Sequence, residues 1–211
     1  MAKYAEPPTS FKASLDSKII SKDVILEWID QLVNPKDQFI LLALFEGIKG
    51  KDFCELANLR PEDVHENMVK LCTGREIEIS DRLKNIIDRC IEETIYYSTS
   101  GKEQKTMPLI DRGYVIKDYP NTKEDVSAFQ RGRQIYNSIQ RIIQSADLYS
   151  SITANNIIES GKLDMIKTRS KELGINCRDY IYSDNIDEVQ KKYNCTIKKK
   201  LYIMNYENYL E

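Results

Sequence analysis

The chain has 211 residues, 41% of them hydrophobic and 30% charged, which is enough for one well-buried core with a short appended arm. Its most apolar run, residues 39–45, is far shorter than the roughly 20 residues of a membrane span, so we expect no role in a membrane. The formal net charge of −2 lacks the overall basic character of most nucleic-acid-binding domains, so any DNA binding must be local.

The first half of the chain alternates between helical and strand-like hydrophobic periods. In chain order it predicts a linker or N-terminal arm over 1–20, helices over 21–33, 36–48 and 51–59, a β-hairpin over 68–79 and a helix over 81–94. Ser21 belongs to the residue types that cap helix N-termini. The run 36–48 is apolar almost all round, which is typical of a helix at the centre of a core. Thr73 and Gly74 form the predicted hairpin turn.

Gly101, Pro108 and Gly113 interrupt the next stretch, which predicts only brief strand pieces. From there on, the pattern predicts strand pieces near 107–110 and 114–116, an amphipathic helix over 123–145 with Phe129, Tyr136, Ile139 and Ile143 facing inward, and helices over 152–160, 162–173, 185–193 and 198–210. The predicted fold class is mainly α with a small antiparallel β-sheet. We expect one core domain over 21–195 and a C-terminal helical tail over 196–211.

Cysteine and histidine usage argues against a metal site. The five cysteines are scattered without a CxxC pair, and His65 is the only histidine, so neighbouring residues supply no zinc ligand set. We predict neither a metal nor a cofactor. The unpaired cysteine count and an N-terminus without the apolar core of a signal peptide predict a cytoplasmic protein.

The stretch from Leu44 to Val64 resembles the first catalytic box of the tyrosine recombinases (phage integrases), whose pattern is G-x-R-x-S-E-L-x-x-L-x-x-x-D-I. The residues that fit this spacing are Gly50, Glu55, Leu56, Leu59, Asp63 and Val64. The predicted hairpin follows where that family has a small sheet. The resemblance implies a core like the catalytic domain of a tyrosine recombinase.

Two further boxes of that family are present in weaker form. The stretch 152–161 resembles the second box, H-x-L-R-H-S/T-x-A, with Asn155, Ile157 and Ser160 in register. The third box, L-G-H, remains only as 173–175. The family's nucleophilic tyrosine follows that box by nine residues, and this spacing reaches Asp184 instead.

The residues that would perform the family's chemistry are replaced. The resemblance implies two arginines that clamp the scissile phosphate, because bidentate guanidinium groups neutralise the charge of a pentacoordinate transition state. Asp52 and Ile158 stand at these two positions, while Asn155, Glu159 and Ile175 stand at histidine positions. We therefore predict no catalytic residues and no enzyme, with Asp52, Asn155, Ile158 and Ile175 as degenerate positions.

Two pairs of residues are alternative candidates for the replaced groups. Lys49 or Lys51 could be aligned with the first arginine, but lysine lacks the planar fork of a bidentate site. Tyr180 and Tyr182 lie near the third box, but a phenol with a pKa of about 10 has nothing there to activate it.

A recombinase-like core with an erased active site resembles the lysogeny repressors of SPβ-type phages. This resemblance implies a prophage-encoded transcriptional repressor in a bacterial host, with double-stranded operator DNA as its partner. Two alternatives remain open. One is an active tyrosine recombinase with a relocated site, and the other is an interaction module whose DNA surface has decayed or needs the family's preceding DNA-clamp domain.

Basic residues are concentrated in the second half of the chain, whereas acidic residues crowd 55–93. On charge alone a solvated surface is the simpler interpretation, but the resemblance favours contacts with phosphates. The candidate DNA-binding residues are Lys102, Lys105, Arg131, Arg133, Arg141, Lys162, Lys167 and Arg169. The apolar face of the tail after 198–200 would dock within the chain or on a neighbouring subunit in a homo-oligomer, and both readings stay open.

Overall fold

The computed structural model describes residues 18–98, 105–124, 126–145 and 152–210. The predicted arm over 1–20 lies almost entirely outside this part of the chain, as does Lys102. Within it, none of the helices combines the length and the apolar character that a bilayer crossing demands.

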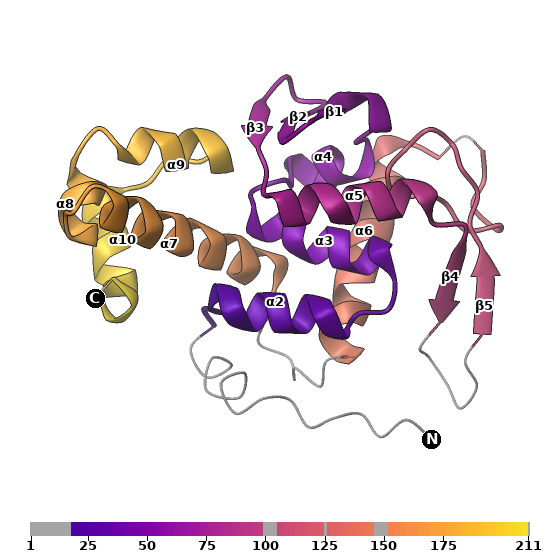
Figure 1. Ribbon diagram of the computed structural model, residues 1–211, viewed down its shortest axis with the longest axis horizontal. Coiled ribbons are helices and arrows are strands. Elements are labelled where there is room, and N and C mark those ends of the chain that lie inside the picture. The colour runs from indigo at the N-terminus through magenta and orange to yellow at the C-terminus, as the bar shows by residue number, and fades with distance from the viewer. Residues whose placement is uncertain (1–17, 99–104, 125, 146–151, 211) are drawn as a thin grey trace.

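The described residues form a mainly helical fold with two small antiparallel sheets, as the sequence predicts (Figure 1). The helices are α2 (Lys22–Gln31), α3 (Pro35–Phe45), η1 (Lys51–Phe53), α4 (Cys54–Ala57), η2 (Pro61–Asp63), α5 (Asp81–Glu92), α6 (Ala128–Ser145), α7 (Ala154–Glu172), α8 (Cys177–Tyr182), α9 (Ile186–Tyr193), α10 (Lys199–Tyr206) and η3 (Glu207–Tyr209). The strands are β1 (Val64–His65), β2 (Met68–Lys70), β3 (Glu76–Glu78), β4 (Ile95–Ser98) and β5 (Lys105–Pro108).

The strands pair in two separate groups. The first sheet has the order β1-β2-β3, with Val69 opposite Ile77 across the predicted hairpin. The second sheet pairs β4 with β5, with Ile95 opposite Pro108. The hairpin over 68–79 is thus confirmed, with a short third strand added to it.

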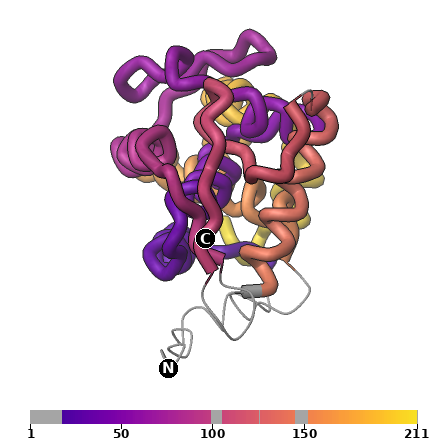
Figure 2. Tube along the Cα trace, turned by 90° about the vertical axis from the view of Figure 1, so that its right-hand side faces the viewer, coloured from indigo at the N-terminus to yellow at the C-terminus, as the bar shows by residue number. Residues whose placement is uncertain are grey.

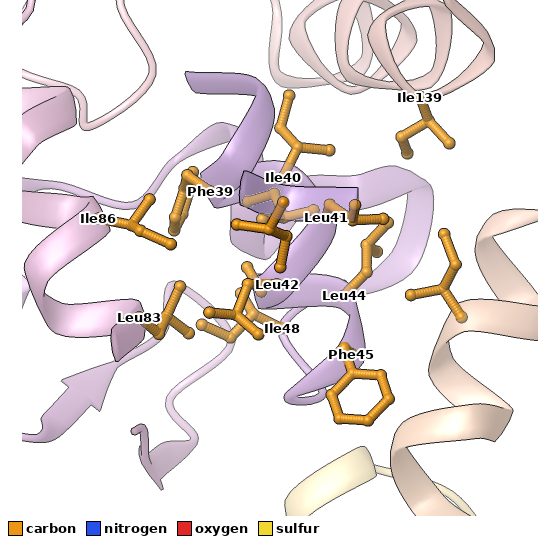
Figure 3. Close-up of a cluster of buried hydrophobic side chains, with 14 of the residues drawn as sticks. Phe39, Ile40, Leu41, Leu42, Leu44, Phe45, Ile48, Leu83, Ile86 and Ile139 are labelled. Atoms are coloured by element: carbon orange, nitrogen blue, oxygen red, sulfur yellow. The ribbon is translucent and has the colours of Figure 1, made fainter. Parts of the chain in front are cut away.

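Helix α3 is the centre of the main core. Its side chains are buried on every side from Phe39 to Phe45. Figure 3 shows them packed against Leu83 and Ile86 of α5 and against Ile139 of α6. Burial of each Leu, Ile or Phe contributes roughly 1.5–3 kcal/mol, so a helix that is apolar all round stabilises the fold only when neighbours enclose it. The predicted central helix is confirmed.

A second, smaller core lies at the far end of α7. In Figure 1, α7 extends from α3 to the group formed by α8, α9 and α10. Leu163 and Ile166 of α7 pack there with Tyr180, Val189 and Tyr202. The C-terminal tail therefore docks within the chain.

Helix α7 runs unbroken through Gly161, where the sequence predicts two separate helices. A Cβ at Gly161 would overlap the carbonyl oxygen of Phe45 and lie 2.7 Å from the Tyr193 hydroxyl. The glycine is thus a site of close approach between α7 and the end of α3, and its lack of a side chain does not end the helix. The prediction of a break was wrong.

Two other predictions were wrong, and two elements were missed. Residues 114–116 form bends instead of a strand, while β4 and α8 were not predicted. Phe129 and Tyr136 of α6, expected to face inward, are 65% and 49% exposed. The buried face of α6 is made instead by Ile135, Ile139, Ile142 and Ile143. The isoleucines cover α3, while the Tyr136 ring packs against that of Phe53 in η1, with the ring centroids 6.3 Å apart.

Polar side chains are also buried where α3 begins. Asp37 accepts a hydrogen bond from the Tyr96 hydroxyl at 2.8 Å and lies 3.5 Å from the Arg141 guanidinium. Burial lowers the pKa of Lys36 to about 8. Burial also raises the pKa of Glu93 to about 7, against the opposing effect of Lys36. This cluster joins α3, α5, α6 and β4.

Replacement of Gly161 by alanine is expected to destabilise the protein. The added methyl group would force α7 away from α3, at a cost of about 2–3 kcal/mol in the free energy of unfolding, partly offset by roughly 1 kcal/mol of helix propensity. Urea denaturation measures the difference. Thr168→Ala, on an exposed position of the same helix, is the control and should change stability by less than about 0.5 kcal/mol. A Gly161→Ala variant as stable as the parent would contradict this packing.

Glu93 should make stability depend on pH. Its pKa in the folded state lies above the ordinary value of 4.5, so the neutral carboxyl group is favoured on folding. This contribution is present below about pH 4.5 and is lost as the pH rises through about 7. Glutamine at position 93 does not titrate. The free energy of unfolding of Glu93→Gln should therefore rise relative to that of the parent between pH 5 and pH 8, by about 1 kcal/mol once the partial exposure of the Glu93 carboxyl group is allowed for. Denaturation at both pH values tests this, with the exposed neighbour Glu92→Gln as the charge control; an equal difference at both pH values would refute it.

Candidate nucleic-acid interface

The first box forms a tight loop between α3 and α4. Asp52 and Phe53 both have left-handed backbone conformations, with φ of 51° and 62°. Such conformations cost non-glycine residues of order 1–3 kcal/mol and persist only where their surroundings impose them. Helix α6 supplies that constraint, because a Cβ at Gly132 would overlap the carbonyl oxygen of Asp52. The loop and α6 are therefore packed backbone against backbone.

Glu55 fixes this loop from the inside. Its fully buried carboxylate accepts hydrogen bonds from the Lys49 amide at 3.0 Å, from the Thr73 hydroxyl at 2.6 Å, and from Arg75 at 2.9 and 2.7 Å. Burial alone would raise the pKa of Glu55, but the hydrogen bonds from Arg75 and Thr73 hold it below its usual value. Arg75 also donates to the carbonyl of Lys192 at 2.6 Å. The family's glutamate position thus joins the first box, the hairpin and α9.

The structure brings the first and second boxes together. The Lys49 ammonium donates to the side-chain oxygen of Asn155 at 2.9 Å and lies 5.6 Å from the centre of the Phe53 ring. Asn155 stands in the first turn of α7, after the N-cap Thr153. Of the family's two arginine positions, Asp52 is exposed on the loop, whereas Ile158 is buried in the main core.

The third box has a structural role. Gly174 has a φ of 67°, and the Ile175 amide donates to the Ser170 carbonyl at 3.0 Å, so 173–175 form the C-terminal cap of α7. The Tyr180 hydroxyl donates to the Asn185 carbonyl at 3.0 Å, and Tyr182 is exposed.

The tyrosine that reaches the boxes is Tyr193, which the sequence analysis did not single out. Its hydroxyl donates to the Phe45 carbonyl at 2.8 Å, and its ring lies 6.0 Å from the Lys162 ammonium. Burial raises the pKa of Tyr193 well above its ordinary value. The family's spacing of nine residues after 173–175 does not reach Tyr193, because α8 lies between the third box and the segment that packs on the first two boxes.

The candidate arginines of α6 differ in their surroundings. The Arg131 guanidinium lies 3.9 Å from the centre of the Tyr114 ring, which Arg60 also approaches to 4.9 Å. Arg133 is exposed and has no ion pair among the described residues. Arg141 turns inward to Asp37. Figure 2 shows this side of the molecule, with the segment that follows β5 beside α6.

The remaining basic candidates are dispersed. Lys162 is only 8% exposed and pairs with Glu159 at 2.7 Å. Arg169 pairs with two carboxylates, those of Glu172 and Glu188. Lys167 is exposed on α7, where its charge opposes the rise that burial causes in the pKa of Asp164. Lys105 is exposed on β5. Ion pairs therefore already neutralise part of the basic second half.

Helix α6 carries no aspartate or glutamate along its 18 residues. Its exposed polar side chains include Gln130, Arg133, Gln134 and Asn137. Lys51 of the adjoining loop is also exposed and precedes the Asp52 carbonyl that contacts Gly132. We call these five residues, Lys51, Gln130, Arg133, Gln134 and Asn137, the α6 surface. Its amides are not among the DNA-binding candidates from the sequence, although the absence of acids over 128–145 is a readable signal.

Metal ligands are not gathered in the part of the chain that the structure describes. No group of three or more His, Cys, Asp or Glu side chains is placed there to hold an ion. The five cysteines are free thiols, and the Cys72 thiol donates to the carbonyl of Cys54 at 3.4 Å.

Comparison with known proteins gives a consistent assignment. Residues 19–210 match the family described as "MrpR, C-terminal catalytic domain". The chain is also 25% identical, over 204 residues, to the SPbeta prophage-derived uncharacterized protein YopR of Bacillus subtilis (strain 168). That alignment covers 89% of this chain and 62% of the relative, so the chain spans less than two thirds of the relative's length. Since the family match extends over nearly all described residues, the chain belongs to the MrpR C-terminal catalytic domain family.

Proposed function

We propose that this chain binds double-stranded DNA through the α6 surface and acts as a transcriptional repressor without strand-cleaving chemistry. The observation that carries the proposal is the composition of α6. Arginine, glutamine and asparagine are the side chains that pair with guanine and adenine edges, and an α-helix fits the major groove. An exposed helix with these residues and no carboxylate suits that role.

The local distribution of charge favours the α6 surface over other surfaces of the protein as the DNA-binding site. The net charge is −2, so a polyanion is attracted only where cations stand apart from carboxylates. Screening at physiological salt limits the reach of an exposed charge to about 8 Å, which makes near neighbours decisive. Arg133 and Lys51 have no ion pair among the described residues, whereas Lys162 and Arg169 are already paired. The exposed carboxylate of Asp52 borders the α6 surface and offsets part of its positive charge.

The residues at the family's catalytic positions support a loss of chemistry. A carboxylate at Asp52 would repel a scissile phosphate, and Ile158 is buried where an arginine would have to face DNA. The Tyr193 hydroxyl is engaged by Phe45, and burial disfavours its phenolate. These features favour binding without cleavage.

The resemblance to SPβ-type lysogeny repressors gives the biological setting of the proposal. The chain corresponds to 62% of the YopR relative, and the family resemblance implies a helical DNA-clamp domain before this core. Repression of phage lytic genes and recognition of an operator would then use both parts.

Strand exchange is the second candidate, since the family description names a catalytic domain. The contact between Lys49 and Asn155 also keeps the two boxes together. The covalent trapping experiment below separates the two functions.

Charge reversal on the α6 surface should reduce the salt dependence of DNA binding. Each phosphate contact contributes about 0.9 to the slope of log affinity against log salt, so Lys51→Glu with Arg133→Glu should lower the slope by about one to two. Titration of a mixed-sequence duplex across a salt series measures it. The matched control is Lys167→Glu with Lys171→Glu, which makes the same charge change on exposed positions of α7. An equal decrease of the slope in both double variants would show that binding depends on the net charge and not on the α6 surface.

No covalent DNA adduct is expected from the parent chain or from Asp52→Arg with Ile158→Arg. Restoring two groups does not restore a site whose members act as a unit. A nicked suicide substrate made from the phage DNA that flanks the gene is incubated with each protein, and denaturing gels reveal any protein-linked strand. Circular dichroism checks that the arginine at the buried position 158 is tolerated. An adduct formed by the parent and lost in Tyr193→Phe would establish an active recombinase.

A further inference from the structure

Two cysteines meet where the first box contacts the hairpin. Cys54 is the first residue of α4, and Cys72 lies in the turn between β2 and β3. The Cys72 thiol donates to the backbone carbonyl of Cys54 at 3.4 Å. This contact places the Cys72 sulfur directly against the Cys54 residue.

The residues that follow each cysteine hold the start of α4 and the hairpin turn against each other. Glu55 accepts a hydrogen bond from Thr73 at 2.6 Å and bonds from Arg75 at 2.9 and 2.7 Å. These contacts are buried or partly buried, so solvent does not compete fully for them. Disulfide geometry demands that both Cβ atoms approach closely, and the Glu55 contacts hold the two segments that carry the cysteines against each other.

Solvent reaches Cys54 and Cys72. None of the other three thiols is hydrogen-bonded to a second cysteine among the described residues. Cys72 is exposed and Cys54 is half-buried. Cys90 is buried in the main core, and Cys177 and Cys195 pack beside the second core. All five cysteines lie in the described part of the chain, and among these residues the hydrogen bond that links two cysteines is the one from Cys72 to Cys54.

We propose that Cys54 and Cys72 are a redox modification site, which peroxide oxidants convert to a reversible intramolecular disulfide. One thiolate attacks the O–O bond of hydrogen peroxide, giving a sulfenic acid and hydroxide. The second sulfur then attacks the sulfenic sulfur, the S–S bond forms and hydroxide leaves. In total two thiols and one peroxide give one disulfide and two waters, a two-electron oxidation.

The surroundings of Cys72 keep its thiol protonated at neutral pH. Burial, with help from the neighbouring Cys54 thiol and the Glu55 carboxylate, raises the pKa of Cys72 to about 11. The thiolate is the reactive form, so Cys72 is nearly inert at neutral pH and becomes more reactive as the pH rises. Disulfide formation should accordingly be faster at pH 9 than at pH 7.

The disulfide would fasten the hairpin to the first-box loop, next to the α6 surface. It would cross-link residues 18 positions apart in the sequence, which restricts the unfolded chain. This inference does not depend on the proposed function, because its readouts are chemical linkage and thermal stability.

The test oxidises the full chain with hydrogen peroxide at low protein concentration and measures its intact mass and digested peptides. We expect the mass to fall by two hydrogens, one linked peptide pair that contains Cys54 and Cys72, and a thermal midpoint raised by up to roughly 10 °C. Dithiothreitol should reverse all three changes. Cys72→Ser, at an exposed position, should abolish them, whereas Cys177→Ser with Cys195→Ser should keep them.

Other outcomes would overturn the proposal. These are a linkage between other cysteines, disulfide-linked dimers through Cys72, sulfinic acids without a linked peptide, or no reaction. Far-ultraviolet circular dichroism of each variant shows whether a lost linkage reflects a lost fold. A linkage that survives in Cys72→Ser would equally reject the assignment of the pair.

Discussion

The buried carboxylate of Glu55 is the interaction on which the arrangement of the first box depends. A carboxylate removed from water costs several kcal/mol unless donors surround it, and here Lys49, Thr73 and Arg75 supply them. These donors come from a loop and from the hairpin, and Arg75 reaches onward to the end of α9 at Lys192. Segments distant in sequence are thereby fixed around one charge.

Glycine contacts extend this frame to the two long helices. Gly132 sets α6 against the first-box loop, and Gly161 sets α7 against the end of α3. Both contacts are backbone against backbone, so neither helix can shift or rotate far. Since the inner face of α6 is fixed in this way, the residues on its outer face are fixed as well. The strained residues Asp52 and Phe53 persist because α6 packs directly on them. The α6 surface is thus a consequence of packing in the core.

The positions that the resemblance aligns with catalytic residues of tyrosine recombinases make structural contacts in this chain. Ile158 fills the main core, 173–175 cap α7, and Asn155 bonds Lys49. Fold alone does not fix function, and the proposed DNA binding rests on the residues of the α6 surface.

The sequence by itself determined features that depend on neighbouring residues: the N-cap Ser21, the all-apolar helix α3 and the hairpin turn of β2 and β3. Only the tertiary structure decided that Gly161 is a contact and not a break, and that Arg141 turns inward while Arg133 faces solvent. Periodicity tells which side chains share a face of a helix, but not what that face meets. Ion pairs and close approaches depend on segments that folding alone brings together, so the tertiary structure decided which basic residues of the described chain remain exposed without an ion pair.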